Sequence, residues 1–530
     1  MDNILPEILH IICSFLSIDD VINFRLVSKT FADIGAAYLL PEVTFYMHEE
    51  ELKRLRDISL HPIFSRHVFS LTYFAQALDS PKVSFREFVR DYKQDMKWNK
   101  TKKVFSPTQL LAEYKKYEEA ADKQDVIMRT QADVALLKEV MPRFPNLEQV
   151  TMSSDVMFYE GIYRTRRPKP FDNIQRGNHR YSLDPEGVRP LEALLSANAD
   201  VKCDLKRLRA GTMDWRFFKR SAGELARLFK PLSNLTRIEL MITVDGMNET
   251  TDEADAIARC RRVLSKGALR TIFRSMPQLE SLCIELLSWD GEDLDRGASL
   301  HHIIEPGFHW PCLRELVIGG VDCDRQELMA VLEVHKETLR NLCLRNVYLK
   351  STSWKKLLPD IRKKLYLTEP CICGDLYGHL EGEDEPDGLD WPQLDNPHFE
   401  PGLEYWYLSV PEDGRHEMRD SINVYCRLGG TTYPDELPLS DDVVDKYYEK
   451  HVKGFLEDYY GEFSDDDDEN EWEDVSSEDD NNEDDDEDDD EVFGNDDDDD
   501  GDDLGINIHQ VQMVLGIIGG HLGHAHSTLY

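Results

Sequence analysis

The chain has 530 residues, of which 41% are hydrophobic, so it is long enough for a large core and for two or more folded units. Its formal net charge is −42, but residues 464–503 hold 27 Asp and Glu with no Lys or Arg, and without those acids the charge is −15. This acidity argues against general nucleic-acid binding, because phosphates would be repelled, and no apolar run approaches the roughly 20 residues that span a bilayer.

The first 40 residues predict three short helices. Pro6 suits a first turn, and the apolar residues after it recur at helical spacing. A second helix follows Ser17, because a Ser three residues before an acid such as Asp20 is a capping pattern. Its wheel is apolar on almost every side, which predicts burial all round; a third helix covers about Lys29 to Leu39. Helices this short cannot hold a core alone, so part of their surface must contact the rest of the chain or another protein.

Residues 2–46 resemble an F-box. The likeness rests on Leu5-Pro6-Glu7-Ile8-Leu9, on Asp20 and on Arg25-Leu26-Val27-Ser28-Lys29, which occur together in the family's order. F-boxes dock on the Skp adaptor of cullin-based ubiquitin ligases. The resemblance implies that eight apolar residues supply or support that interface: Leu5, Pro6, Ile8, Leu9, Ile12, Leu16, Leu26 and Val27. The alternative is a helical cap on the domain that follows.

A mostly helical linker and the start of a solenoid are predicted over residues 47–140. Residues 61–73 have the pattern of a first strand. Residues 84–139 are predicted to be mostly helical, because Tyr114, Tyr117 and Ala121 recur at helical spacing.

Residues 141–368 contain a recurring unit, a Leu followed by a short alternating apolar stretch that predicts a strand. Clear units begin at Phe144, Leu232, Met276, Trp310 and Thr338, and a weaker one begins at Leu205. The leucines of the clear units are 88, 44, 34 and 26 residues apart, so the first gap leaves room for an unrecognised unit. Helices are predicted between the strands, over residues 187–199, 221–230, 254–273 and 325–335.

The combination resembles the F-box/leucine-rich-repeat proteins, particularly the long fungal ones. It implies a mixed α/β fold: an N-terminal three-helix F-box, an irregular leucine-rich-repeat-like solenoid with a parallel sheet, and a disordered acidic C-terminal tail. The alternative for the middle of the chain is an α/β domain with incidental leucines. Substrates vary widely in that family, so the resemblance names none.

Two further segments follow the repeats. Residues 369–462 are rich in Pro, Gly, acids and aromatic residues, which predicts a segment that caps the solenoid, although it could instead form a substrate pocket. Residues 463–530 predict a disordered acidic tail, because a run of like charges repels itself and buries no apolar area.

No cofactor and no metal site is predicted. The ten cysteines are scattered and several lie in apolar runs, which indicates free thiols in a reducing compartment. Cys371-Ile372-Cys373 has no second pair near it in the sequence, and the EF-hand-like start at Asp496 lacks a Glu at its twelfth position. The tail histidines His521, His524 and His526 lie in a Gly-rich stretch. Hydrolase, zinc-protease and phosphate-loop motifs are missing, which lowers the case for an enzyme.

The resemblance therefore implies a non-catalytic substrate-recognition subunit of a Skp–cullin–F-box ubiquitin ligase, expected in the cytoplasm or nucleus or both. Its partners would be the Skp adaptor, through it a cullin, and an unknown target protein, with no nucleic acid and no membrane. Two alternatives remain: an F-box scaffold outside a ligase, and a protein that binds basic partners through its acidic tail.

Overall fold

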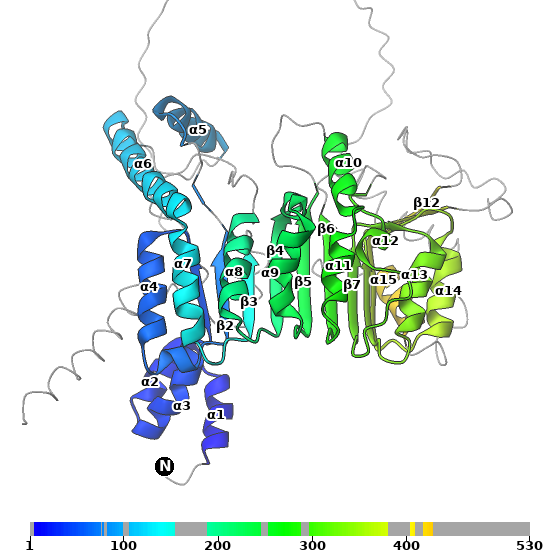
Figure 1. Ribbon diagram of the computed structural model, residues 1–530, viewed down its shortest axis with the longest axis horizontal. Helices are drawn as coiled ribbons and strands as arrows, with labels where there is room; N and C mark the ends of the chain where they lie inside the picture. The colour runs from blue at the N-terminus through cyan, green and yellow to red at the C-terminus, as the bar shows by residue number, and fades with distance from the viewer. Residues whose placement is uncertain are drawn as a thin grey trace, which may run out of the picture. The chain divides into compact units, whose positions relative to one another are not determined.

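The fold is mixed α/β, with three N-terminal helices followed by a long sheet that helices cover (Figure 1). The computed structural model describes residues 5–75, 77–78, 82–98, 105–153, 188–244, 253–287, 296–379, 403–408 and 417–427. Within them, every helix is too short or too polar to cross a bilayer. The predicted acidic tail, the tail histidines and the EF-hand-like stretch lie outside the described residues.

The three predicted N-terminal helices are confirmed as α1 (Pro6–Ser14), α2 (Ile18–Arg25) and α3 (Lys29–Leu39). Pro6 occupies the first turn of α1, where its missing N–H costs nothing. The Ser17 hydroxyl caps α2, accepting a hydrogen bond from the Asp20 N–H at 3.1 Å.

The expectation that the second helix is buried on every side is wrong. Val21 is the only buried residue of α2, which ends at Arg25. Leu26 and Val27 lie beyond its end and are exposed. Three helices of 8 to 11 residues enclose too little volume to bury all of their apolar side chains, so part of that surface stays open.

Eleven of the described strands form one parallel sheet. The order along the sheet is β1-β2-β3-β4-β5-β6-β7-β9-β11-β10-β8, and β12 pairs antiparallel with β11. The strands are β1 (Glu42–Tyr46), β2 (Ser70–Phe74), β3 (Gln149–Ser153), β4 (Arg207–Asp214), β5 (Arg237–Thr243), β6 (Ser281–Leu287), β7 (Glu315–Gly319), β8 (Asp322–Cys323), β9 (Asn341–Arg345), β10 (Tyr348–Leu349), β11 (Glu369–His379) and β12 (Leu403–Leu408). Each of β1 to β6 therefore pairs with the next strand in the chain, as in a repeat protein, whereas β7 pairs with β9.

Helices connect these strands and lie against one face of the sheet, in front of it in Figure 1. A connection that always steps to the next strand in the same direction leaves its helices on one face. They are α4 (Glu49–Leu60), α7 (Ala132–Val140), α8 (Val188–Val201), α9 (Ala222–Phe229), α10 (Glu253–Leu264), α11 (Ala268–Arg274), α12 (Leu300–Ile303), α13 (Arg325–Val334) and α14 (Trp354–Lys364). Two more helices, α5 (Phe85–Trp98) and α6 (Pro107–Thr130), are inserted before α7, and α15 (Glu417–Cys426) follows β12.

The core lies between the helices and the sheet. On β5, Ile238, Leu240 and Ile242 are fully buried, whereas the alternating residues Glu239 and Met241 are only half-buried. The same alternation recurs on β7 and β9. The sheet therefore has one apolar face under the helices and one more open face, as the period of two along a strand requires.

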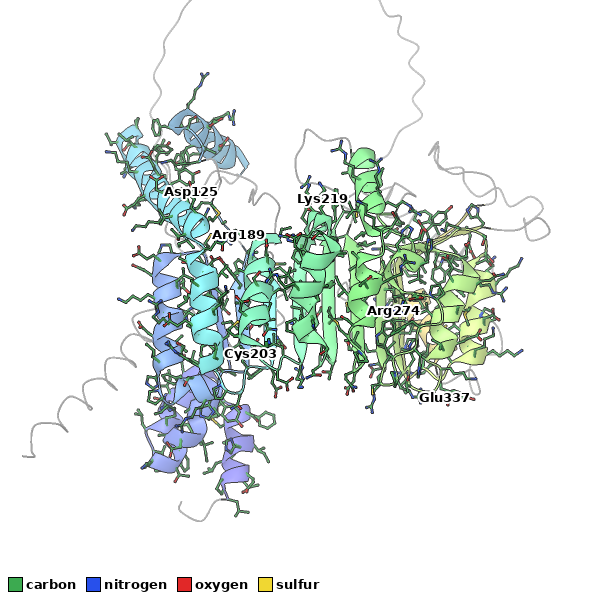
Figure 2. All side chains as sticks on the ribbon, viewed as in Figure 1. Asp125, Arg189, Cys203, Lys219, Arg274 and Glu337 are labelled. Carbon is green, nitrogen blue, oxygen red and sulfur yellow. The ribbon has the colours of Figure 1, made fainter. Side chains whose placement is uncertain are left out.

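Buried polar contacts join the helices to the strands near the start of the sheet. Asp133 on α7 is fully buried; it accepts hydrogen bonds from Tyr73 on β2 and from Arg189 on α8, both at 2.8 Å. Figure 2 labels Arg189 at the end of α8. The cationic Arg189 compensates the buried carboxylate for its lost hydration. These contacts therefore stabilise the packing of α7 and α8 against the strands.

The predicted strands of the repeated units are confirmed, and the weak unit at Leu205 is β4, which fills the long first gap. The single helix predicted over residues 254–273 is in fact two, α10 and α11. The break is at Gly267, whose φ of +78° belongs to the left-handed region that favours glycine.

Candidate functional site

The N-terminal helices carry a group of exposed apolar side chains. Leu5 is 65% exposed, Ile8 45% and Ile12 42%, and these side chains recur along α1. Pro6 is also exposed. The nine residues of α1 thus leave several apolar side chains in water that the rest of the F-box does not cover. Exposed apolar patches of this kind mark interaction sites.

Two of the eight residues predicted to supply or support the interface are less exposed than the others. Leu9 is only 3% exposed and lies in the core of the helices with Cys13, and Leu16 is half-buried. A side chain as covered as Leu9 gains little by further burial, so the prediction for Leu9 is that it supports the interface. The remaining two, Leu26 and Val27, follow α2; Leu26 is 80% exposed.

Sequence reasoning left Ile11 and Phe15 out of the predicted interface. Phe15, at the C-terminal end of α1, is 79% exposed, and Ile11 is also exposed. The signal that could have found them was the width of the apolar arc, since a helix this short cannot bury both edges of so wide an arc against one small core. We call the exposed set on and beside α1 the α1 surface; it consists of Leu5, Pro6, Ile8, Ile11, Ile12 and Phe15.

Arg25 packs the three helices against the first unit of the sheet. Its Nε donates a hydrogen bond to the Ala32 carbonyl at 3.0 Å, and its guanidinium lies 5.9 Å from the centre of the Phe64 ring. The Arg25 stem runs past Gly35, where a Cβ would come within 2.4 Å of it. This packing uses the end of α2 and leaves the α1 surface open.

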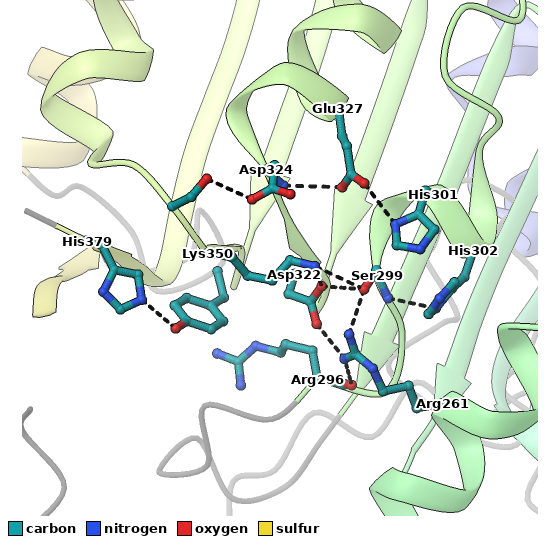
Figure 3. A network of polar contacts seen from close by, with 12 residues as sticks. Arg261, Arg296, Ser299, His301, His302, Asp322, Asp324, Glu327, Lys350 and His379 are labelled. Carbon is teal, nitrogen blue, oxygen red and sulfur yellow. Dashed lines mark hydrogen bonds and ion pairs between the residues drawn. The ribbon is translucent and has the colours of Figure 1, made fainter. Parts of the chain in front are cut away.

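A second candidate site is a polar network near the carboxyl ends of the later strands (Figure 3). Its centre is the buried Asp322 on β8. Asp322 accepts hydrogen bonds from Arg261 and from the Ser299 hydroxyl, and the Lys350 ammonium lies 2.9 Å from its Oδ1. The Ser299 N–H donates to His302 Nδ1 at 3.1 Å. Residues from three separate segments of the chain, those of Arg261, Ser299 and Lys350, therefore converge on one carboxylate.

The electrostatics of this network favour a structural role over acid–base chemistry. Burial would raise the pKa of Asp322, but the hydrogen bonds from Arg261, Ser299 and Lys350 outweigh burial and hold the pKa below its usual value. The same contact with Asp322 raises the pKa of Lys350 despite its burial, so this amine stays protonated and cannot serve as a general base. The Ser299 hydroxyl donates to Asp322 and accepts a hydrogen bond from Arg261, so both of these contacts hold it within the network.

The comparison with known families identifies the N-terminal helices. Residues 2–35 match the F-box domain, a stretch that includes all eight residues predicted to bind or support a partner. A search of the curated proteins finds no match to the chain. The chain therefore carries an F-box domain at its N-terminus, followed by a long parallel sheet that is consistent with leucine-rich repeats.

Proposed function

We propose that this protein is a substrate-recognition subunit of a Skp–cullin–F-box ubiquitin ligase. F-box domains bind the Skp adaptor, and the F-box here presents the α1 surface together with Leu26 and Val27. The observation that carries the proposal is the exposure of Leu5, Ile8 and Ile12 on a folded F-box whose own core is formed by other side chains, Leu9 and Cys13 among them.

The energetics support an adaptor interface on the α1 surface. Full burial of one Leu, Ile or Phe side chain contributes about 1.5–3 kcal/mol, so several such side chains can drive stable association even after its entropic cost. The surface carries little charge to desolvate, because Glu7 and His10 are the ionisable residues of α1.

The domain over residues 141–368 is proposed to bind the target protein. Its support is the more open face of the sheet, which carries charged pairs such as Arg209 with Glu239 at 2.6 Å and Arg237 with Glu315 at 3.3 Å. Repeat domains use such extended faces for recognition. The receptor would perform no bond chemistry; it would raise the effective concentration of target lysines near the conjugating enzyme.

The segment after the repeats is proposed to cap the sheet. In its described part, Asn423 on α15 accepts a hydrogen bond from the Ile372 N–H of β11 at 2.8 Å, and Arg427 donates to the Thr368 carbonyl at 2.7 Å. These contacts satisfy backbone groups at the start of β11, where unpaired groups would otherwise invite pairing with another chain.

The experiment that tests the proposal is capture of the Skp adaptor and a cullin from the cytoplasm and nucleus by the tagged full chain. The double variant Leu5→Ala/Pro6→Ala is the comparison. We expect the wild type to retain both partners and the variant to retain neither while it stays folded by circular dichroism.

Three other outcomes contradict the proposal in different ways. Adaptor without cullin would indicate a scaffold outside a ligase. Capture of neither partner by folded wild type would leave the F-box as a helical cap. Capture of basic proteins alone, lost in salt and lost when residues 464–503 are deleted, would favour the acidic tail as the binding element.

A further inference from the structure

Three cysteines meet on the open face of the sheet near its C-terminal end. Cys371 and Cys373 are two residues apart on β11, so their side chains emerge on the same face. Cys343 on the neighbouring strand β9 is in register with Cys371. The three Sγ atoms all lie within 4.8 Å of one another, and those of Cys371 and Cys373 are 3.7 Å apart. The sequence shows only a Cys-x-Cys pair; the register of the sheet adds the third thiol.

The spacing of these sulfurs suits a tetrahedral metal ion. Zinc binds thiolates at about 2.3 Å, which places two sulfurs of one tetrahedron about 3.8 Å apart. The distance between the sulfurs of Cys371 and Cys373 already matches that value. The sulfur of Cys343 lies within 4.8 Å of the other two, so small rotations about χ1 would bring it to the same distance. All three sulfurs come from adjacent strands, so the ligands are held by a rigid element.

Two cationic side chains act on this cluster. Arg345 follows β9 residue Cys343 by two positions, and Arg419 lies on α15, so the charges of both guanidinium groups act on the sulfur of Cys371. Those same cationic groups would offset the excess negative charge of three thiolates around one divalent ion. Metal binding then displaces the protons of the thiols.

A disulfide is the competing use of these thiols. The S–S bond is about 2.05 Å long, far shorter than the 3.7 Å between Cys371 and Cys373. Residues i and i+2 of a strand are about 6.6 Å apart at Cα, at the upper end of the range that disulfides usually span. All three residues are free cysteines in the structure.

We propose that Cys343, Cys371 and Cys373 bind a thiophilic divalent cation, Zn²⁺, through three thiolates, with a fourth position for water or an added ligand. The ion would fasten β11 to β9 and so stabilise the terminal part of the sheet. This inference rests on side chains distant in sequence from the F-box and stands whether or not the adaptor is the partner.

The test is the zinc content of the full chain, purified with reductant and dialysed against trace Zn²⁺, for the wild type and for Cys343→Ser and Cys371→Ser. Cys283→Ser is the matched control, because Cys283 lies on the same face but two strands from Cys343. We expect one equivalent of zinc in the wild type and the control, and loss of that equivalent in the other two variants. All variants carry the same tail histidines, so any zinc bound there is the same in each and does not change the difference between variants.

A second measurement counts the ligands. Cadmium in place of zinc should give ultraviolet thiolate-to-metal absorption with three thiolates per ion, and zinc should raise the melting temperature of the wild type and not of Cys343→Ser. The proposal is overturned if reduced wild type binds no stoichiometric zinc, if Cys283→Ser loses zinc equally, or if mass spectrometry finds a disulfide between two of the three cysteines.

Discussion

The F-box helices and the sheet differ in how much of their apolar surface the chain itself buries. In the sheet, residues such as Leu240 on β5 and Leu342 on β9 lie fully covered between strands and helices, and each unit is completed by its neighbours. In the F-box, Leu5 and Phe15 stay largely exposed because three short helices cannot cover them. The sheet is thus covered from within the chain, whereas the described part of the F-box leaves the apolar α1 surface open.

The comparison predicts that the sheet depends most on its buried charge network. Asp322→Ala should destabilise the fold by about 3–5 kcal/mol, because Arg261 and Lys350 would lose the carboxylate that compensates them. Denaturant unfolding measures the change. The exposed Asp57→Ala is the control and should shift stability by less than about 0.5 kcal/mol. Equal effects of the two substitutions would mean that the network contributes nothing beyond a surface charge.

The two faces of one strand should respond differently to the same truncation. Leu240→Ala on the helix-covered face should cost about 2–5 kcal/mol, because it opens a cavity in the core. Met241→Ala on the open face of the same strand should cost clearly less, since this side chain is only half-buried. Thermal unfolding measures the loss of stability in both variants. A larger loss of stability for Met241→Ala than for Leu240→Ala would reverse the assignment of the two faces.

The smallest expected effect is a pH dependence at the polar network. Burial, together with the charges of His301 and Arg261, lowers the pKa of His302 to about 4 from its usual 6.5. Between these values the unfolded chain binds the proton and the folded chain does not, so this contribution to stability is complete above pH 6.5 and falls as the pH drops toward 4.

The variant His302→Asn tests that pH dependence. An Asn oxygen can still accept the Ser299 N–H, so the contact should survive while the titration disappears. The melting temperature of the variant should therefore fall less steeply than that of the wild type between pH 6.5 and 4. Parallel slopes would show that His302 does not couple to folding.

The sequence predicted much of this architecture because its signals are local. Pro6 and Ser17 mark helix starts, and alternating apolar stretches such as the one before Ile238 mark strands, so the helices and most strands follow from neighbouring residues. The break at Gly267 was missed because one glycine inside a helical pattern does not reveal its φ.

The candidate sites were less predictable because they depend on long-range pairing. The exposure of Phe15 and the burial of Leu9 follow from how the three helices pack, not from the apolar pattern that both residues share. Cys343 approaches Cys371 only through the register of β9 with β11. Asp322 likewise gathers partners from segments more than 20 residues away in the chain.

The measurement that tests the central claim most directly is the affinity of the purified full chain for the purified Skp adaptor by calorimetric titration. Ile8→Asp/Ile12→Asp places charges on the α1 surface and leaves Leu9 and Cys13 in the core, while Leu60→Asp, at a residue of α4 that is 59% exposed, is the matched control. We expect the double variant to lose about 2 kcal/mol or more of binding free energy, a loss of at least ~30-fold, and the control to bind as the wild type does. Equal binding by all three folded proteins would contradict the claim that this surface is the adaptor site.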